Sequence, residues 1–213
     1  MRSTAVEPRG RLRLTCGISF GVRRLAPLIA EFGAAHPGVE FDLDLSDRTV
    51  DLVEEGFDLA IRIGATGHQT FVSRRLGWTR LVCCAAPAYL AGRAAPQIPA
   101  DLAQHECLEY SVLPGPRTWV FADAAGQRHE VPVHGRVQAN NGRMLAALAA
   151  EGMGITLEPD FIVEPELRAG RLVEVLPEYS PPRSPIAAVY PSRRHLSAKV
   201  RRFVEFLATA LVR

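Results

Sequence analysis

Hydrophobic and polar residues follow two different periods along the first part of the chain. Residues 11–17 and 39–45 alternate with a period of two, which predicts half-buried strands. Residues 22–36 between them carry apolar side chains at helical spacing, and Pro37 and Gly38 mark a turn. Because the second strand alternates apolar with acidic residues throughout, we expect it to lie near an edge of its sheet.

The stretch VDLVEEGFDLAIRIGA predicts a helix that ends and turns directly into a strand. The helix is expected over residues 49–55, with cap residues in the preceding Ser-Asp-Arg-Thr, and Gly56 can adopt the left-handed conformation that ends helices. Residues 57–63 are apolar apart from Asp58 and Arg62, which is typical of a strand buried on both faces. This order of strands and helices favours a parallel α/β sheet.

The second half of the chain repeats the plan with shorter elements. Two strands are expected on either side of a turn at Gly126, and a later strand leads to Asn140 and Asn141, which precede a helix. The last element, residues 196–213, has one apolar helical stripe, with Ser197 as its expected N-cap. No linker-like tract separates the halves, so we expect two α/β lobes that share a cleft.

Charge and composition exclude several classes of protein. The chain has 25 Lys and Arg and 23 Asp and Glu, a formal net charge of +2, and its basic residues are scattered, unlike a nucleic-acid-binding face. No apolar run approaches the ~20 residues that a membrane helix needs. The N-terminus lacks the apolar core of a secretory signal. We therefore expect a cytoplasmic protein that does not contact a membrane.

The residues that carry chemistry form no enzyme or metal motif. The four cysteines, Cys16, Cys83, Cys84 and Cys107, match no metal-ligand spacing. The adjacent pair could form a redox switch, but its apolar strand favours a structural role, because free cysteine behaves as a small hydrophobe. The six histidines show no metal spacing, and a nucleophile elbow, a phosphate loop and a dinucleotide fingerprint are all absent. We expect no cofactor, no metal and no catalytic residue.

Polar turns follow four of the expected strands, at residues 17–21, 46–48, 62–64 and 139–142. In open α/β sheets, ligands bind beyond the carboxyl ends of the strands. Helix N-termini at such positions present free N–H groups that suit an anion. Ser19, Asn140 and Asn141 are therefore candidate ligand contacts, with the alternative that each only caps its helix.

Five segments in this order resemble the effector-binding domain of LysR-type transcriptional regulators: VDLVEEGFDLAIRIG, RRLGWTRLVCCAAPAYLA, PADLAQHECLEYS, the NNG before a helix, and YPSRRHLSAKVRRFVEFL. The resemblance covers the chain from about Gly10 to its end. It implies an α/β, two-lobed, type 2 periplasmic-binding-protein-like fold with the effector in the cleft between the lobes. Lobe one would be 11–82 plus 188–213, lobe two 83–187, and 1–10 the remnant of a linker.

The resemblance also implies an effector site built from nine residues. They are Ser19, Phe20, Gly21, Ser46, Arg62, Ile63, Gly64, Asn140 and Asn141. The implied ligand is a small molecule, and the helix N-termini favour a carboxylate or another anion. For Arg62, an ion pair with Asp58 or with an acid of a neighbouring strand is an equally open alternative.

A homodimer is implied as well, with a tetramer as the alternative for the full-length protein. A helix of lobe one, residues 23–35, would meet a helix of lobe two, residues 142–151, of the partner, and both are apolar on more than one side. The contacts would come from Leu25, Ile29, Ala30, Phe32, Met144, Leu145 and Leu148.

The family also carries an N-terminal winged helix-turn-helix and a linker helix, and neither is present in this sequence. We therefore expect the chain to be part of a longer regulator, one that binds DNA only through the missing domain. The alternative is a periplasmic-type solute-binding protein for a small anionic ligand, which would share the fold but would need a signal peptide.

Overall fold

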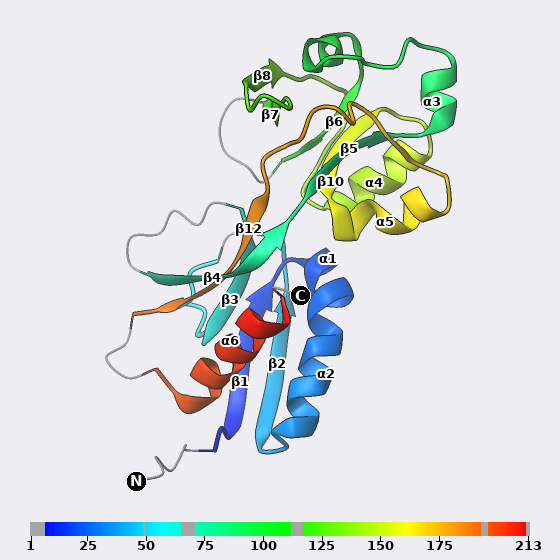
Figure 1. Ribbon diagram of the computed structural model, residues 1–213. Coiled ribbons are helices and arrows are strands. Elements are labelled where there is room, and N and C mark those ends of the chain that lie inside the picture. The colour runs from blue at the N-terminus through cyan, green and yellow to red at the C-terminus, as the bar shows by residue number, and fades with distance from the viewer. Residues whose placement is uncertain (1–6, 49, 65–70, 112–116, 193–195, 212–213) are drawn as a thin grey trace. The chain divides into compact units, whose positions relative to one another are not determined.

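The computed structural model describes residues 7–48, 50–64, 71–111, 117–192 and 196–211 (Figure 1). The chain forms two compact units, each with its own sheet and core. Unit 1 comprises Met1–Trp78 and Ser184–Arg213, and unit 2 comprises Thr79–Arg183. The chain thus passes between units after residues 78 and 183, where the sequence predicted 82 and 187.

Unit 1 contains a five-stranded sheet in the order β2-β1-β3-β12-β4. The strands are β1 (Gly10–Cys16), β2 (Val39–Leu45), β3 (Leu59–Ile63), β4 (Phe71–Thr79) and β12 (Ser184–Pro191). β1 is parallel to β2 and to β3, as predicted, whereas β12 runs antiparallel to β3. The alternating strand β2 lies at an edge and β3 lies in the middle, so both sequence predictions of strand position are confirmed.

The first helix begins earlier than its hydrophobic pattern predicts. Helix α1 (Ile18–Phe20), the π-helical segment Gly21–Leu25 and α2 (Ala26–Ala35) form one continuous run directly after β1. The predicted turn over 17–21 therefore shrinks to Gly17. The reason is a long-range cap, because Asp47 Oδ1 accepts a hydrogen bond from the backbone N–H of Ile18 (3.1 Å).

The helix expected over residues 49–55 is wrong. Residue 49 lies outside the described residues, and the chain after it makes tight turns, with Asp51 Oδ1 accepting from the N–H groups of Val53 (2.8 Å) and Glu54 (3.0 Å). The turns end at Gly56, whose φ of 72° confirms the left-handed conformation expected there. The N–H of Phe57 then bonds to the carbonyl of Leu52 (2.8 Å), which draws the segment onto β3 instead of extending a helix.

Helix α6 (Ala198–Ala210) closes the core of unit 1. Its predicted stripe, Val200, Phe203, Val204, Leu207 and Leu211, is buried throughout. The ring of Phe203 lies 5.0 Å from that of Phe32 on α2 and 5.4 Å from that of Phe41 on β2, in edge-to-face geometry. Ser197 occupies the N-cap position as predicted, although its side chain makes no capping bond.

Unit 2 has a second five-stranded sheet, in the order β11-β5-β10-β6-β9. The strands are β5 (Leu81–Ala85), β6 (Cys107–Tyr110), β9 (Gln138–Ala139), β10 (Ile155–Pro159) and β11 (Val173–Glu174). Helices α4 (Gly142–Ala150) and α5 (Asp160–Arg168) cover one face. Packed on the other face are α3 (Pro87–Ala91), the 3-10 helix η2 (Pro99–Gln104) and a hairpin of β7 (Thr118–Ala122) and β8 (Arg128–Pro132).

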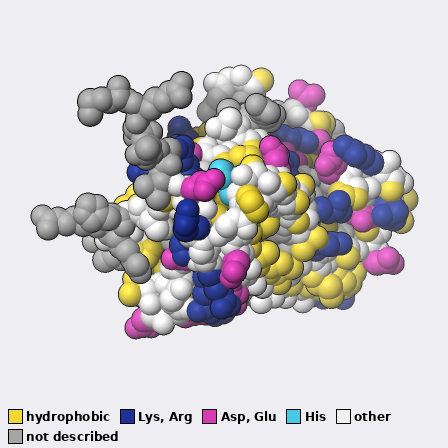
Figure 2. Space-filling model, turned by 90° about the horizontal axis from the view of Figure 1, so that it is seen from below, with side chains coloured by type: hydrophobic (Ala, Val, Ile, Leu, Met, Phe, Trp, Pro, Cys, Tyr) yellow, Lys and Arg dark blue, Asp and Glu magenta, His cyan; other side chains and the backbone are white. Residues whose placement is uncertain are grey.

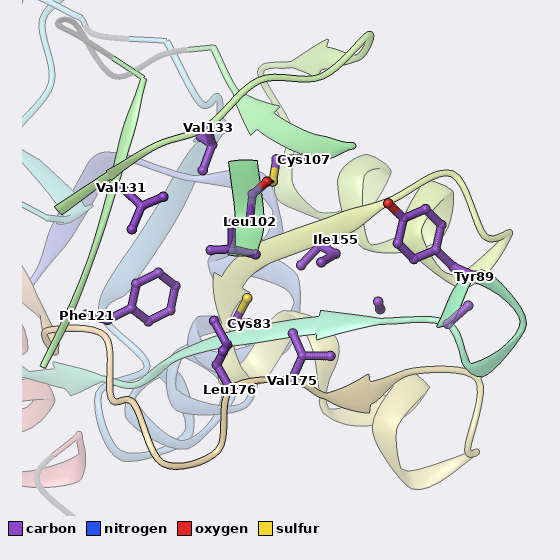
Figure 3. Close-up of a cluster of buried hydrophobic side chains, with 12 residues drawn as sticks. Cys83, Tyr89, Leu102, Cys107, Phe121, Val131, Val133, Ile155, Val175 and Leu176 are labelled. Atoms are coloured by element: carbon purple, nitrogen blue, oxygen red, sulfur yellow. The ribbon is translucent and has the colours of Figure 1, made fainter. Parts of the chain in front are cut away.

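The core on that second face joins residues from distant parts of unit 2 (Figure 3). Phe121 and Val131 from the hairpin approach Leu102 from η2, and Cys83 and Ile155 come from the central strands. The hairpin turns at Gly126, with a φ of 81°, as the sequence predicted.

Candidate functional site

The carboxyl ends of three parallel strands meet at one edge of the unit 1 sheet. Cys16 at the end of β1 lies opposite Leu45 on β2 and Ile61 on β3. The backbone N–H of Ser46 donates to the carbonyl of Cys16 (2.9 Å). The polar segments after these strands therefore emerge side by side, as expected for a binding edge of an α/β sheet.

Ser19 lies at this edge inside the first helical turn, so it is not the N-cap. Its side chain is 5% exposed, and among the described residues its Oγ has no hydrogen-bond partner. A buried hydroxyl without a partner is energetically unfavourable, and a ligand or a water can satisfy it. Phe20 beside it is also buried.

Gly21 serves packing at this place. A Cβ on Gly21 would lie 2.6 Å from Leu45 Cδ2 and 3.0 Å from Cys16 Sγ, so any side chain would push α1 away from β2. The close approach of the helix to the sheet thus explains the glycine, and the effector contact expected at Gly21 stays a prediction.

Arg62 is half-buried where β3 emerges, and its Nη1 donates to the carbonyl of Ser46 (3.2 Å). The alternative of an ion pair with Asp58 is wrong: the Asp58 carboxylate contacts Lys199 Nζ (3.1 Å) at the opposite end of the strand. Burial raises the pKa of the nearby Cys16 thiol; the Arg62 guanidinium opposes this rise, and the carboxylates of Asp47 and Asp44 add to it. The edge therefore combines one guanidinium with carboxylates of the protein itself.

Gly64 ends this segment with a φ of 95°, and its N–H donates to the carbonyl of Pro185 (2.9 Å). Among the described residues, no atom lies within 4 Å of the place where its Cβ would be. The left-handed backbone explains the glycine, and open space lies beside it. Ile63 next to it is half-buried.

In unit 2, the N-terminus of α4 carries the two predicted asparagines. Asn141 is the N-cap, and its Oδ1 accepts from the N–H of Met144 (3.2 Å), while Asn140 is exposed. Asn141 therefore caps α4 and Asn140 does not, and the effector contacts expected at both stay predictions.

Two carboxylates that the sequence analysis missed already occupy the helix N-termini. Asp47 caps α1, as described above. In unit 2, Glu158 is buried, and a Cβ on Gly142 would lie only 2.2 Å from its Oε2, so the carboxylate sits against the first turn of α4. Thr156 Oγ1 donates to Glu158 Oε1 (3.4 Å). An acid at the end of an apolar strand, in ITLEPD, was the available signal for Glu158.

The candidate dimer residues divide into two groups. Leu25, Phe32 and Leu145 are at most 2% exposed, so they belong to the cores and cannot touch a partner directly. Ala30 and Met144 are exposed, and Ile29 and Leu148 are half-buried. Further exposed apolar side chains of unit 1, which were not among the predicted contacts, include Val22, Leu43 and Leu45.

All four cysteines are buried as free thiols. Burial raises the pKa of Cys16, Cys84 and Cys107 to about 12 and raises that of Cys83 as well. Thiols with such pKa values contain almost no thiolate at neutral pH, which favours a structural role. Within the described ranges, no cluster of three or more His, Cys, Asp or Glu side chains could hold a metal ion.

Basic and acidic side chains are interspersed on the face drawn in Figure 2, with hydrophobic side chains between them. The same mixture appears in the ion pairs, such as Arg11 with Asp42 (2.7 Å) and Arg80 with Glu174 (2.8 Å). Among the described residues, no helix is both long enough and apolar enough to cross a membrane.

Comparison with known sequences gives one family over nearly the whole chain. Residues 5–212 match the family model described as the LysR substrate binding domain. The HTH-type transcriptional regulator DmlR of Escherichia coli (strain K12) is 37% identical over 201 residues, which cover 94% of this chain and 65% of DmlR. An uncharacterized HTH-type transcriptional regulator of Haemophilus influenzae is 36% identical over 192 residues, covering 90% of this chain and 66% of that protein. The chain thus spans just under two thirds of the length of these relatives.

Solved structures show the same architecture. The regulatory domain of CrgA, a LysR-type transcriptional regulator from Neisseria meningitidis, has a TM-score of 0.81 and 30% identity, covering 96% of this chain and 100% of that domain. The full-length Vibrio cholerae virulence activator AphB has a TM-score of 0.81 and 26% identity, covering 98% of this chain and 71% of AphB.

Proposed function

Since the chain belongs to the family of LysR substrate binding domains, we propose that it is the effector-sensing part of a DNA-binding transcriptional regulator. The family match confirms the resemblance read from the sequence, and the structural neighbours confirm the two-lobed α/β fold. The relatives are named as transcriptional regulators and activators and not as enzymes. They give no support to the alternative of a periplasmic solute-binding protein. A cytoplasmic location belongs to the same proposal, because such a regulator acts on DNA.

The observation that carries the proposed site is the meeting of three strand ends in unit 1. Ser19 offers a buried hydroxyl without a partner among the described residues, and Arg62 offers a guanidinium next to Ser46. Gly64 leaves open space beside the same strand end. A small molecule with both a hydrogen-bonding group and an anionic group suits this combination.

The proposed effector class is a small carboxylate or another anion, recognised by Arg62. The helix N-termini no longer support this preference, because Asp47 and Glu158 already occupy them. A planar guanidinium at a strand end can bind a carboxylate with two parallel hydrogen bonds. In unit 2, Asn140 has an exposed amide and Asn141 caps α4, and effector contacts at both are proposed separately from the unit 1 residues.

A thermal-shift screen of small carboxylates, followed by calorimetry, tests the site. Ser19→Ala removes only the hydroxyl and is expected to weaken binding of a confirmed effector about fivefold or more, the effect of a lost hydrogen bond of about 1 kcal/mol. Ser197→Ala is the matched control, because that exposed serine makes no capping bond. Equal affinity of the two variants and the parent chain would contradict the assignment.

We also propose that two copies of the chain form a dimer. Val22, Leu43 and Leu45 are exposed apolar side chains of one unit, and Ile29 and Ala30 extend the same helical run. Met144, 53% exposed on α4, is the corresponding contact in unit 2. A contact between two copies would remove these apolar side chains from water, and exposed apolar surface commonly marks protein–protein contact. In a two-fold dimer, the α2 side of one subunit would meet α4 of the other.

A further inference from the structure

Tyr89 and His105 connect two short helical segments on the second face of the unit 2 sheet. Tyr89 lies on α3, and His105 directly follows η2. Their side chains are 4% and 5% exposed, and the Tyr89 hydroxyl lies 3.3 Å from His105 Nδ1. The backbone N–H of Glu106 donates to the same hydroxyl (3.0 Å). The hydroxyl therefore links α3 to the chain that leaves η2 for β6.

These contacts fit a neutral His105 ring and not a protonated one. The Tyr89 oxygen already accepts the Glu106 N–H, so its own hydrogen is left to donate, and His105 Nδ1 is within reach as the acceptor. A protonated imidazole carries N–H groups on both nitrogens. Protonation would thus direct two N–H donors at one hydroxyl, and the hydroxyl hydrogen would lose its acceptor. A buried polar group that loses its partner is energetically unfavourable.

The surroundings of the ring also oppose a positive charge on balance. Burial is the largest cause that lowers the pKa of His105, and the guanidinium of Arg93 adds to it. That guanidinium is fixed over the Tyr89 ring, with its carbon 4.6 Å from the ring centre. The carboxylate of Asp101 on η2 and a backbone hydrogen bond to Ala94 act in the opposite sense.

Other charged side chains of these segments have partners of their own. The Asp101 carboxylate accepts from the backbone N–H groups of Gln97 (2.9 Å) and Ile98 (3.1 Å). Beside η2, the segment before β6 and the hairpin strand β8 contain three ion pairs: Glu106 with Arg136 (3.5 Å), Arg128 with Glu130 (3.0 Å) and His129 with Asp123 (3.2 Å). The Cys107 thiol stays uncharged, because burial raises its pKa to about 12.

We propose that the contact between His105 and Tyr89 is an acid-sensitive switch that holds α3 and η2 on the sheet of unit 2. With a neutral ring, the Tyr89 hydroxyl bonds to His105 and fixes the Glu106 N–H. With a protonated ring, Tyr89 loses its acceptor and this helical layer loosens, while α4 and α5 keep their separate core on the other face. The switch lies outside the proposed effector residues, so its failure would leave that proposal standing.

The direction of the pH effect follows from linkage. The closed form lowers the pKa of His105 below its ordinary value of 6.5, so the open form binds the proton more tightly. Opening is therefore favoured as the pH falls through 6.5. Such local opening is distinct from unfolding of the whole unit, because only the contacts of one layer are lost.

Amide hydrogen exchange at about pH 7 and about pH 5, on either side of the histidine range, tests the switch. Each rate is divided by that of an unstructured peptide at the same pH. The protection of the Glu106 N–H is expected to fall about fivefold or more in acid, the effect of one lost hydrogen bond. The N–H groups of α4 are expected to keep their protection.

Three variants make the test specific. In His105→Gln the fall is expected to disappear, because the glutamine amide can accept from Tyr89 and does not titrate. His134→Gln changes an exposed histidine of the same unit and is expected to behave like the parent chain. Tyr89→Phe removes only the hydroxyl and is expected to raise the pKa of His105 in an NMR titration of the ring, because the neutral ring loses its donor.

Three results would overturn the proposal. An equal fall in the parent chain and in His105→Gln would show that another group titrates. A parallel loss of protection in α4 would show unfolding of the whole unit instead of a switch. An unchanged pKa of His105 in Tyr89→Phe would show that the hydroxyl does not keep the ring neutral.

Discussion

Placing a methyl group at Gly142 is expected to destabilise the chain, even though alanine is the better helix former. In the structure, a Cβ at this position would lie 2.2 Å from Glu158 Oε2, 2.9 Å from Ile162 Cδ1 and 3.0 Å from Glu158 Cδ. Glu158 is 3% exposed, so its carboxylate cannot move into solvent without disturbing the packing around it. The variant Gly142→Ala therefore forces the carboxylate and the first turn of α4 apart.

The magnitude follows from two opposing effects. Overpacking of a well-filled site destabilises by about 1–3 kcal/mol. The intrinsic preference of a helix for alanine over glycine returns at most about 1 kcal/mol. We expect a net decrease of about 1–2 kcal/mol in the free energy of unfolding, measured as a lower midpoint in urea with an unchanged slope.

A matched control and a double variant make the test specific. Gly92 has a φ of −97°, and no atom of the described residues lies within 4 Å of the place where its Cβ would be. Gly92→Ala is therefore expected to leave stability unchanged or to raise it by up to about 1 kcal/mol. In a chain that carries Glu158→Ala, the further change Gly142→Ala is expected to cost less than it does in the parent chain, because the clash with the carboxylate is gone and only the close approach to Ile162 Cδ1 (2.9 Å) remains. A Gly142→Ala variant as stable as the parent chain would refute the placement of Glu158 against α4.

Three further predictions concern pH, the thiols and the oligomeric state. Burial lowers the pKa of His105 below its ordinary value of 6.5, so the unfolded chain binds more protons at this residue than the folded chain does. Stability is therefore expected to fall as the pH drops through 6.5, and to fall less steeply in His105→Gln. An identical pH dependence of the urea midpoint in both proteins would contradict this. The buried thiols are expected to react with a thiol reagent only after unfolding. A disulfide formed by Cys83 or Cys84 on mild oxidation would contradict this and support the alternative that the pair is a redox switch. Light scattering at micromolar concentration is expected to give a dimer mass for the parent chain and a monomer mass for Ala30→Glu, because an unpaired charge in an interface is unfavourable. A monomer mass for the parent chain would contradict the proposed dimer.

Local patterns predicted the elements whose contacts are local or simple in geometry. The strict alternation of residues 39–45 gave an edge strand, and the stripe that includes Phe203 gave a helix with one buried side. In both cases one face of the element is covered by a single core, so the period of the apolar residues in the sequence matches the pattern of buried side chains.

The errors arose where contacts distant in sequence decide the structure. The N–H of Ile18 is capped by Asp47, which lies in the bend after β2, and no local pattern around Ile18 reveals that cap. The segment after residue 49 has helical spacing, but the side chain of Asp51 bonds to the backbone and makes a turn instead. Apolar residues on several sides of a helix were read as a dimer surface, although Leu25 and Leu145 fill cores within the subunit.

The same limit applies to the site. The positions of Ser19, Ser46 and Arg62 after consecutive strands could be predicted, because the carboxyl ends of parallel strands share an edge. The anion preference of the helix N-termini could not be judged, since it depends on whether a carboxylate of the protein reaches them. Asp47 and Glu158 do so through the fold.

The most direct test of the account is to map the effector onto the chain by amide chemical shifts. A carboxylate confirmed by calorimetry is titrated into isotope-labelled protein, and the same titration is repeated with Ser19→Ala. The account predicts that the largest shifts fall on residues 17–21, 46–48 and 62–64, and that they weaken in the variant. Saturable binding whose shifts leave all three segments unchanged would contradict the proposed effector site.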